Sequence, residues 1–135
     1  MEIFEDKNHK IIHGDAIKAL NEIADNSIDL IFADPPYNIG KIFNGHVEKW
    51  DSDEAYLNWC YQWIDLCIKK LKPNGSFYVM TSTQFMPYFD IYIRAKLNIM
   101  ARCTNLSCSV LKIKTTIHLI QMIFWLRQKL GQKES

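Results

Sequence analysis

The sequence predicts an α/β protein built on a parallel sheet with flanking helices, and three features support this fold class. The run at 28–33 is almost continuously apolar, which is typical of a parallel strand covered on both faces. Segments with helical spacing of apolar residues alternate with strand-like runs along the chain. Clusters of Asp, Asn, Ser, Gly and Pro separate these segments. The alternation of strand and helix indicates a doubly wound sheet.

The first elements are a short strand, a helix and the apolar strand. We expect a strand at 10–13, which ends at a Gly-Asp pair. Asp15 can cap a helix that reaches about Ile23, because apolar residues recur there at helical spacing. A turn at 25–27 then leads into the strand at 28–33.

The central part of the chain predicts a loop followed by a long helix. Residues 38–51 have the composition of a loop. The acidic and serine residues at 51–53 can cap a helix that reaches about residue 72. Its apolar seam consists of Leu57, Cys60, Ile64, Cys67 and Leu71. The Pro-Asn-Gly sequence at 73–75 is expected to stop it.

One more strand and one more helix complete the pattern. Residues 77–80 form an apolar and aromatic run that predicts the next strand. Polar residues at 81–83 follow it directly. Pro87 lies near the start of a further helix that ends at about residue 97.

Polar residues gather at the points where the predicted strands end. Asp15, the segment 34–37 and the segment 81–83 each follow a strand. Ligands of open α/β sheets bind beyond the carboxyl ends of the strands. We therefore expect the chemistry of this protein at that edge of the sheet.

The segment 34–37, Asp-Pro-Pro-Tyr, has the composition of a small rigid floor for a flat base with an amino group. Each proline fixes φ and donates no hydrogen bond, so nearby carbonyls stay free to accept. Asp34 adds a second acceptor, and Tyr37 adds an aromatic face. Two acceptors beside one ring suit an exocyclic amine, whose two N–H groups both need partners. The alternative is an ordinary Pro-Pro turn after a strand.

Composition bounds the other possibilities. The 135 residues fit one modest domain, and the net charge of +1 provides no strong basic field for a phosphate backbone. The four cysteines have no metal-binding spacing and are interpreted as reduced thiols. The N-terminal residues do not resemble a signal peptide, and the apolar stretch at 117–126 is shorter than the ~20 residues of a membrane span. We expect a cytoplasmic protein without a metal.

Several motifs together resemble the DNA amino-methyltransferases, specifically the adenine-N6 enzymes whose chain opens near the Asp-Pro-Pro-Tyr motif. The segments at 13–16, 27–40 and 71–80 occur in the order and at about the spacing of that family. The resemblance covers about residues 10–98. It implies a Rossmann-like methyltransferase fold, S-adenosyl-L-methionine as cofactor, and DNA as the partner from which an adenine is flipped.

The resemblance also implies roles for individual residues. Asp34 and the carbonyl of Pro35 would accept the two N6 hydrogens of adenine, with Pro36 completing the rigid motif. Tyr37 would stack on the extruded base. Asp15 and Asp34 would lie beside the cofactor, although a helix cap is an equally good role for Asp15. Aspartate at position 34 favours adenine over other amine targets within the family.

Other side chains carry weaker signals. His13 and His46 could act as acid–base groups, but lone histidines are more often structural or solvated. The aromatic residues at positions 56, 59, 61 and 63 fall within the long predicted helix, which favours packing in the core. Phe43 and Trp50, in the loop after the motif, are expected to contact a base or DNA.

The remainder of the chain departs from the family pattern. The glycine-containing strand-to-helix turn of the family is missing, since Gly131 stands alone near the C-terminus. Back-translated from one nucleotide earlier, the tail can spell YGSMYEPIL, which resembles a downstream segment of the family. We therefore expect residues 1–98 to be the N-terminal half of a catalytic domain, and 99–135 to be an out-of-frame tail.

Two functions follow from this incomplete fold. One is an adenine-N6 DNA methyltransferase by family, which we expect to be inactive as this fragment. The other is a non-catalytic remnant that binds nucleic acid or protein weakly. Without the missing half, the strand at 28–33 would expose an unpaired edge, which is an aggregation liability.

Overall fold

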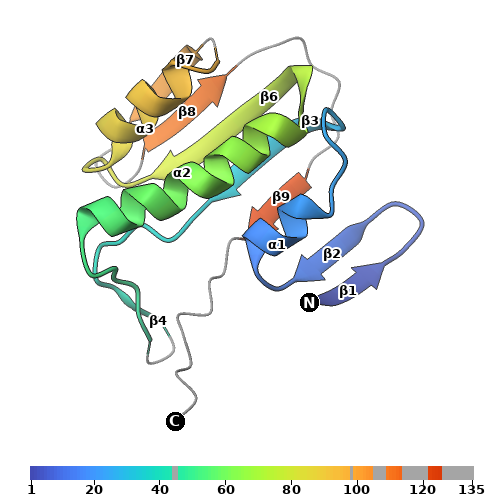
Figure 1. Ribbon diagram of the computed structural model, residues 1–135, viewed down its shortest axis with the longest axis horizontal. Helices are drawn as coiled ribbons and strands as arrows, with labels where there is room; N and C mark the ends of the chain where they lie inside the picture. The colour runs from blue at the N-terminus through green and yellow to red at the C-terminus, as the bar shows by residue number, and fades with distance from the viewer. Residues whose placement is uncertain (44–45, 98, 105–108, 114–121, 126–135) are drawn as a thin grey trace.

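The computed structural model describes residues 1–43, 46–97, 99–104, 109–113 and 122–125. Within these ranges the chain forms a five-stranded sheet, two small two-stranded sheets and three helices (Figure 1). The predicted mixture of helices and strands is confirmed at this level.

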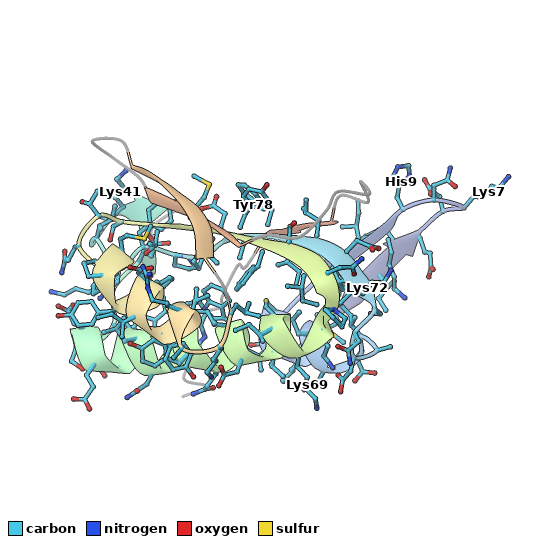
Figure 2. The ribbon with its side chains drawn as sticks, turned by 90° about the horizontal axis from the view of Figure 1, so that it is seen from above. Lys7, His9, Lys41, Lys69, Lys72 and Tyr78 are labelled. Atoms are coloured by element: carbon cyan, nitrogen blue, oxygen red, sulfur yellow. The ribbon has the colours of Figure 1, made fainter. Side chains whose placement is uncertain are left out.

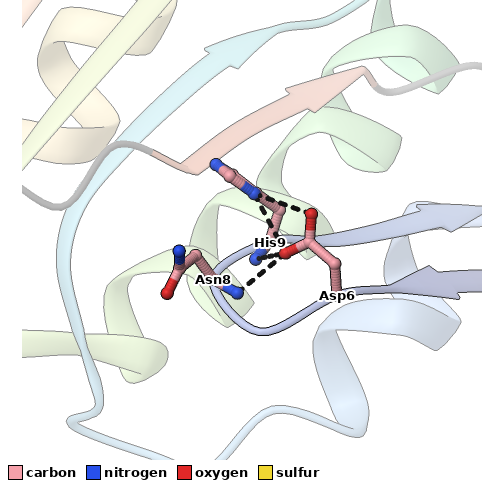
Figure 3. Close-up of polar contacts among 3 residues, drawn as sticks. All are labelled: Asp6, Asn8 and His9. Carbon is pink, nitrogen blue, oxygen red and sulfur yellow. Dashed lines mark hydrogen bonds and ion pairs between the residues drawn. The ribbon is translucent and has the colours of Figure 1, made fainter.

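The N-terminus forms a hairpin of its own. Strand β1 (Glu2–Glu5) pairs antiparallel with β2 (Lys10–His13). Asp6 organises the turn, because its Oδ1 accepts hydrogen bonds of 2.7 Å from the backbone N–H groups of Asn8 and His9 (Figure 3). These bonds, led by that from Asn8, lower the pKa of the Asp6 carboxyl. The strand expected at 10–13 is present as β2. The expectation that it belongs to the main sheet is wrong, because it pairs with β1 in a separate two-stranded sheet.

The main sheet has the strand order β7-β8-β6-β3-β9. Strand β3 (Ile28–Asp34) lies parallel to both β6 (Leu71–Thr81) and β9 (Met122–Trp125). Strands β7 (Ile99–Thr104) and β8 (Ser109–Ile113) are antiparallel to their neighbours. The sheet is therefore mixed, with a parallel group around β3.

The expectation of an unpaired edge at the apolar strand is wrong. Ile31 of β3 pairs with Phe77 of β6 on one side and with Met122 of β9 on the other. Segments beyond residue 98 thus supply three of the five strands. Residues 31–33 of β3 are thus paired on both sides, which removes the liability that an open edge would create there.

Three helices pack on one face of this sheet. They are α1 (Ala16–Asn21), α2 (Asp53–Lys70) and α3 (Met86–Arg94). Figure 1 shows them in front of the sheet, and Figure 2 shows them below it, with Tyr78 on the opposite side. In the described ranges no helix covers that second face. Consistent with this, Ile31 and Ala33 of β3 are buried, whereas the alternating residues Leu30, Phe32 and Asp34 are only half-buried.

The helices begin at the residues that the sequence indicates. Asp15 Oδ1 accepts a hydrogen bond of 2.9 Å from the backbone N–H of Lys18, and Ser52 Oγ accepts one of 3.0 Å from Ala55. Both bonds satisfy N–H groups that have no partner within the helix. Acidic residues in the first turn of α2 and lysines in its last turn also stabilise the helix, because their charges interact favourably with the helix dipole.

The end of α2 differs from the prediction. The chain passes directly from Lys70 into β6, so the Pro-Asn-Gly sequence at 73–75 belongs to the strand and does not form a separate stop. Gly75 is required there by close packing. A Cβ at this position would lie 2.7 Å from side-chain atoms of Leu71 and 3.0 Å from the carbonyl oxygen of Ile28.

The core lies between the helices and the covered face of the sheet. Its largest fully buried side chains are Trp63, Tyr56, Phe77, Phe85 and Phe89. Cys60 and Cys67 of α2 are buried beside them, as expected for reduced thiols. Burial raises the pKa of both thiols to about 12. None of the helices in the described ranges is both long and apolar enough to span a bilayer.

Candidate functional site

The Asp-Pro-Pro-Tyr segment lies where β3 ends. Asp34 is the last residue of β3, and the neighbouring parallel strand β6 ends at Thr81. The register Ala33–Val79 aligns the two strands, so their carboxyl ends reach the same edge of the sheet. The structure therefore brings the segments 34–37 and 81–82 to one edge, where ligands of parallel sheets bind.

Tyr37 folds back onto the carboxylate at the end of the strand. Its hydroxyl donates a hydrogen bond of 2.7 Å to Asp34 Oδ1, and both side chains are partly buried. Among the described residues, no donor is bonded to Asp34 Oδ2. One carboxylate oxygen is thus fixed by the motif itself, and the other can accept from a ligand.

The diproline between these two residues is anchored from helix α2. The hydroxyl of Tyr56 donates a hydrogen bond of 2.7 Å to the carbonyl oxygen of Pro36. Pro35 is buried, and within the described part of the chain its carbonyl has no hydrogen-bond donor. Beside the Asp34 carboxylate, the Pro36 carbonyl is therefore already hydrogen-bonded, whereas the Pro35 carbonyl can accept a hydrogen bond from a ligand.

The loop after the motif is fastened by Asn38. This residue adopts a left-handed conformation with φ of 55°. Its Oδ1 accepts a hydrogen bond of 2.9 Å from the backbone N–H of Trp50, and its Nδ2 donates one of 3.2 Å to Asp53 Oδ1. The loop also contains a small hairpin of β4 (Ile42–Phe43) and β5 (His46–Val47), which the loop prediction missed.

Trp50 packs with core aromatic residues. Its ring centroid lies 4.9 Å from that of Tyr56 and 5.1 Å from that of Trp59. These contacts give Trp50 a packing role that its position in the loop did not indicate. Tyr37 is the aromatic residue bonded to Asp34. The side chain of Phe43, the other expected contact, lies outside the described residues.

Glu48 is a site residue that the sequence reasoning missed. Its carboxyl accepts a hydrogen bond from the backbone N–H of Tyr37. Burial raises the pKa of Glu48, and the charge of Asp34 raises it further, against opposing effects of Tyr37 and Lys41. No local pattern marks this residue, because its role depends on the hairpin that folds the loop back onto the motif.

Asp15 and the two histidines have other surroundings. Asp15 caps α1, and the strand before it belongs to the N-terminal hairpin, outside the main sheet. His13 is exposed, with its Nδ1 3.1 Å from Glu2 Oε2. In Figure 2 the hairpin turn with His9 lies at the opposite end of the molecule from Lys41, in the loop after the motif. The side chain of His46 lies outside the described residues.

Buried hydroxyls follow β6 at the same edge. Thr81 Oγ1 and Ser82 Oγ are buried without a partner of hydrogen-bond geometry in the described part of the chain. Thr81 nevertheless lies near enough to the Tyr56 hydroxyl to oppose the rise of its pKa, which burial dominates. Within the same ranges, no group of three or more His, Cys, Asp or Glu side chains could hold a metal ion.

Comparison with known proteins identifies the family. The profile of a DNA methylase family, the N6/N4 methyltransferases, matches residues 28–134. The chain is 46% identical over 99 residues to the DNA adenine methyltransferase YhdJ of Escherichia coli K12, covering 73% of this chain and 33% of that protein. It is 38% identical over 89 residues to the type II methyltransferase M.BamHI of Bacillus amyloliquefaciens, covering 66% of this chain and 21% of that protein.

A third relative gives a similar match. The type II methyltransferase M.HpaI of Haemophilus parainfluenzae is 37% identical over 81 residues, which cover 60% of this chain and 26% of that protein. The matches thus span a third or less of these relatives' length. The family profile extends over most of this chain, on both sides of residue 98. The chain belongs to the DNA methylase family of N6/N4 methyltransferases.

Proposed function

We propose that this chain carries the target-base site of a DNA adenine-N6 methyltransferase, at the Asp-Pro-Pro-Tyr segment that ends β3. The observation that carries the proposal is the placement of one carboxylate, one uncommitted carbonyl and one aromatic ring within four residues at the ligand-binding edge of the sheet. Family membership and the name of the Escherichia coli relative, a DNA adenine methyltransferase, support adenine as the target.

The proposed chemistry is recognition of an amine by two acceptors. Asp34 Oδ2 and the Pro35 carbonyl accept the two N–H groups of the adenine 6-amino group. With both hydrogens held, the nitrogen keeps a fixed orientation toward a methyl donor. Positioning of this kind is a large part of catalysis when the reacting groups are already reactive.

The Tyr37 ring supplies the second part of the site. A base that leaves the DNA stack loses a few kcal/mol of stacking, and an aromatic side chain recovers about 1–3 kcal/mol of it. The hydrogen bond from Tyr37 to Asp34 keeps ring and carboxylate together. We propose that the base lies against this ring while its amine reaches Asp34.

The methyl donor that the family implies is S-adenosyl-L-methionine. Asp15, the residue proposed to contact it, is engaged as the cap of α1, outside the main sheet. Asp34 alone does not make a cofactor cleft, and the described residues offer no glycine-rich turn beside it. The residues present therefore do not fit a complete cofactor site.

This misfit favours a second candidate function. In that alternative the chain binds an adenine base, or another nucleic-acid or protein partner, without transferring a methyl group. The assignment of residues 99–135 as an out-of-frame tail belongs to the same proposal. Sequencing of the encoding DNA around codon 99, and of the region downstream of codon 135, tests that assignment directly.

A methyl-transfer assay separates the two functions. Purified chain is incubated with unmethylated DNA and S-adenosyl-L-methionine labelled on the methyl group, and label in adenine is counted. The methyltransferase proposal predicts incorporation that Asp34→Ala abolishes and that Asp51→Ala, at an exposed carboxylate, leaves unchanged. Absence of incorporation with wild-type chain would support the binding function, and incorporation by Asp34→Ala would contradict the proposed site.

A further inference from the structure

The Pro36–Tyr37 peptide bond is held from both sides by residues distant in sequence. Its carbonyl oxygen accepts the hydrogen bond of 2.7 Å from the Tyr56 hydroxyl of α2. Its N–H donates to the Glu48 carboxyl from the loop that follows the motif. Because the six atoms of a peptide unit are nearly coplanar, fixing both groups fixes the orientation of the whole plane.

The orientation of that peptide plane fixes the two backbone rotations of the motif that the proline rings leave free. The two prolines fix their own φ angles, but the rotation about ψ of Pro36 and φ of Tyr37 remains open. These two rotations set where the Tyr37 side chain leaves the backbone. The 2.7 Å contact between the Tyr37 hydroxyl and Asp34 Oδ1 therefore depends on the orientation of this peptide plane.

Tyr56 is well suited to act as a fixed donor. Its side chain is fully buried, and its ring lies 4.7 Å from that of Phe85 and 4.9 Å from that of Trp50. Packing on two sides leaves the phenol little freedom to turn away. Burial raises the pKa of the hydroxyl, so it stays protonated and can donate throughout the neutral range.

We propose that Tyr56 and Glu48 are positioning residues that clamp the Pro36–Tyr37 peptide plane and thereby hold the Asp34 carboxylate and the Tyr37 ring in the geometry that recognises a 6-aminopurine. The inference rests on the proposed function, since it assigns two supports to the same site. Neither residue touches the base. Their contribution is to keep the amine acceptors and the aromatic face aligned.

A purely structural role predicts a different result. If Tyr56 only fills the core, removing its hydroxyl would weaken the binding of all purines equally or not at all. If Tyr56 aligns the acceptors, removing its hydroxyl should weaken only the binding energy that comes from hydrogen bonds to the 6-amino group. The comparison of adenosine with purine riboside, which lacks the 6-amino group, isolates that interaction.

The test measures both affinities by NMR titration for wild-type chain and for Tyr56→Phe. The expected result is a preference of the wild type for adenosine that falls about fivefold in Tyr56→Phe, the scale of one hydrogen bond, while affinity for purine riboside is retained. Tyr92→Phe is the matched control. It removes a hydroxyl that donates to Asp65, between α2 and α3 and outside the motif, and should keep the full preference.

Glu48 provides the second arm, which does not disturb the core. Glu48→Ala should lower the adenosine preference, whereas Glu48→Gln keeps an acceptor for the Tyr37 N–H and should restore it. A preference that survives in both Tyr56→Phe and Glu48→Ala would overturn the inference and leave the proposed function intact. A wild-type chain that does not distinguish the two nucleosides would overturn the proposed function, and this inference with it.

Discussion

Replacement of Asn38 tests how firmly the loop beside the motif is held. Asn38 combines a left-handed backbone, with φ of 55°, with two side-chain hydrogen bonds, one from the Trp50 N–H and one to Asp53. Asn38→Gly keeps the backbone conformation accessible and removes both bonds. Asn38→Ala removes the same bonds and also places a Cβ in a conformation that alanine disfavours.

The magnitudes follow from these separate terms. A protein hydrogen bond contributes about 0.5–1.5 kcal/mol, so Asn38→Gly, which removes two of them, should lose about 1–3 kcal/mol of unfolding free energy. The left-handed conformation adds about 1 kcal/mol for alanine, which gives a total of about 2–4 kcal/mol for Asn38→Ala. For a chain of this length each kcal/mol corresponds to roughly 3–5 °C in Tm.

Asn26 provides the matched control. It has nearly the same φ, 53°, but within the described ranges its side chain makes no hydrogen bond. Urea unfolding, followed by circular dichroism, would be measured for glycine and alanine variants at both positions. We expect a small change for Asn26→Gly and about 1 kcal/mol for Asn26→Ala. Equal losses for Asn38→Gly and Asn26→Gly would refute the claim that the Asn38 side chain fastens the loop.

Three further predictions concern packing, thiol chemistry and the cofactor. Gly75→Ala should destabilise the fold by about 1–3 kcal/mol in urea unfolding, because its Cβ would meet Leu71 and the Ile28 carbonyl; an unchanged midpoint would show that the contact relaxes. Cys60 and Cys67, whose pKa values burial raises to about 12, should resist iodoacetamide at pH 8.5 in peptide mapping and react in urea. Since unfolded thiols ionise near pH 8.5, unfolding free energy should fall as pH rises from about 8.5 toward 10, and a flat profile would contradict the assigned burial. Calorimetric titration should show S-adenosyl-L-methionine binding weaker than micromolar, whereas micromolar affinity would mean that the cofactor site is present after all.

Local patterns were sufficient to predict the elements that bear the site. The apolar run at 28–33 predicted β3, although in the described ranges helices cover only one face of the sheet, so its residues alternate between buried and half-buried. Asp15 and Ser52 were identifiable as caps because their side chains satisfy N–H groups close by in sequence. The placement of Asp34 at the sheet edge followed from the order of strands and helices.

The missed features depend on contacts between distant segments. The first strand of the N-terminal hairpin is exposed along its length, so no apolar alternation marked it. The Pro-Asn-Gly sequence at 73–75 has the composition of a helix stop, but pairing of Leu71 with Ile28 draws it into β6. Tyr56 and Glu48 reach the motif only after α2 and the loop have folded against it, which no local pattern encodes.

The most direct test of the proposed site compares adenosine and purine riboside binding to wild-type chain and to Asp34→Ala. Chemical-shift changes would be followed by NMR as each nucleoside is added, with Asp51→Ala as the control for a lost surface carboxylate. The account predicts that the wild type and Asp51→Ala bind adenosine more tightly than purine riboside, and that Asp34→Ala loses this preference while it still binds both rings. A preference for adenosine that persists in Asp34→Ala would contradict the assignment of this carboxylate as the amine acceptor.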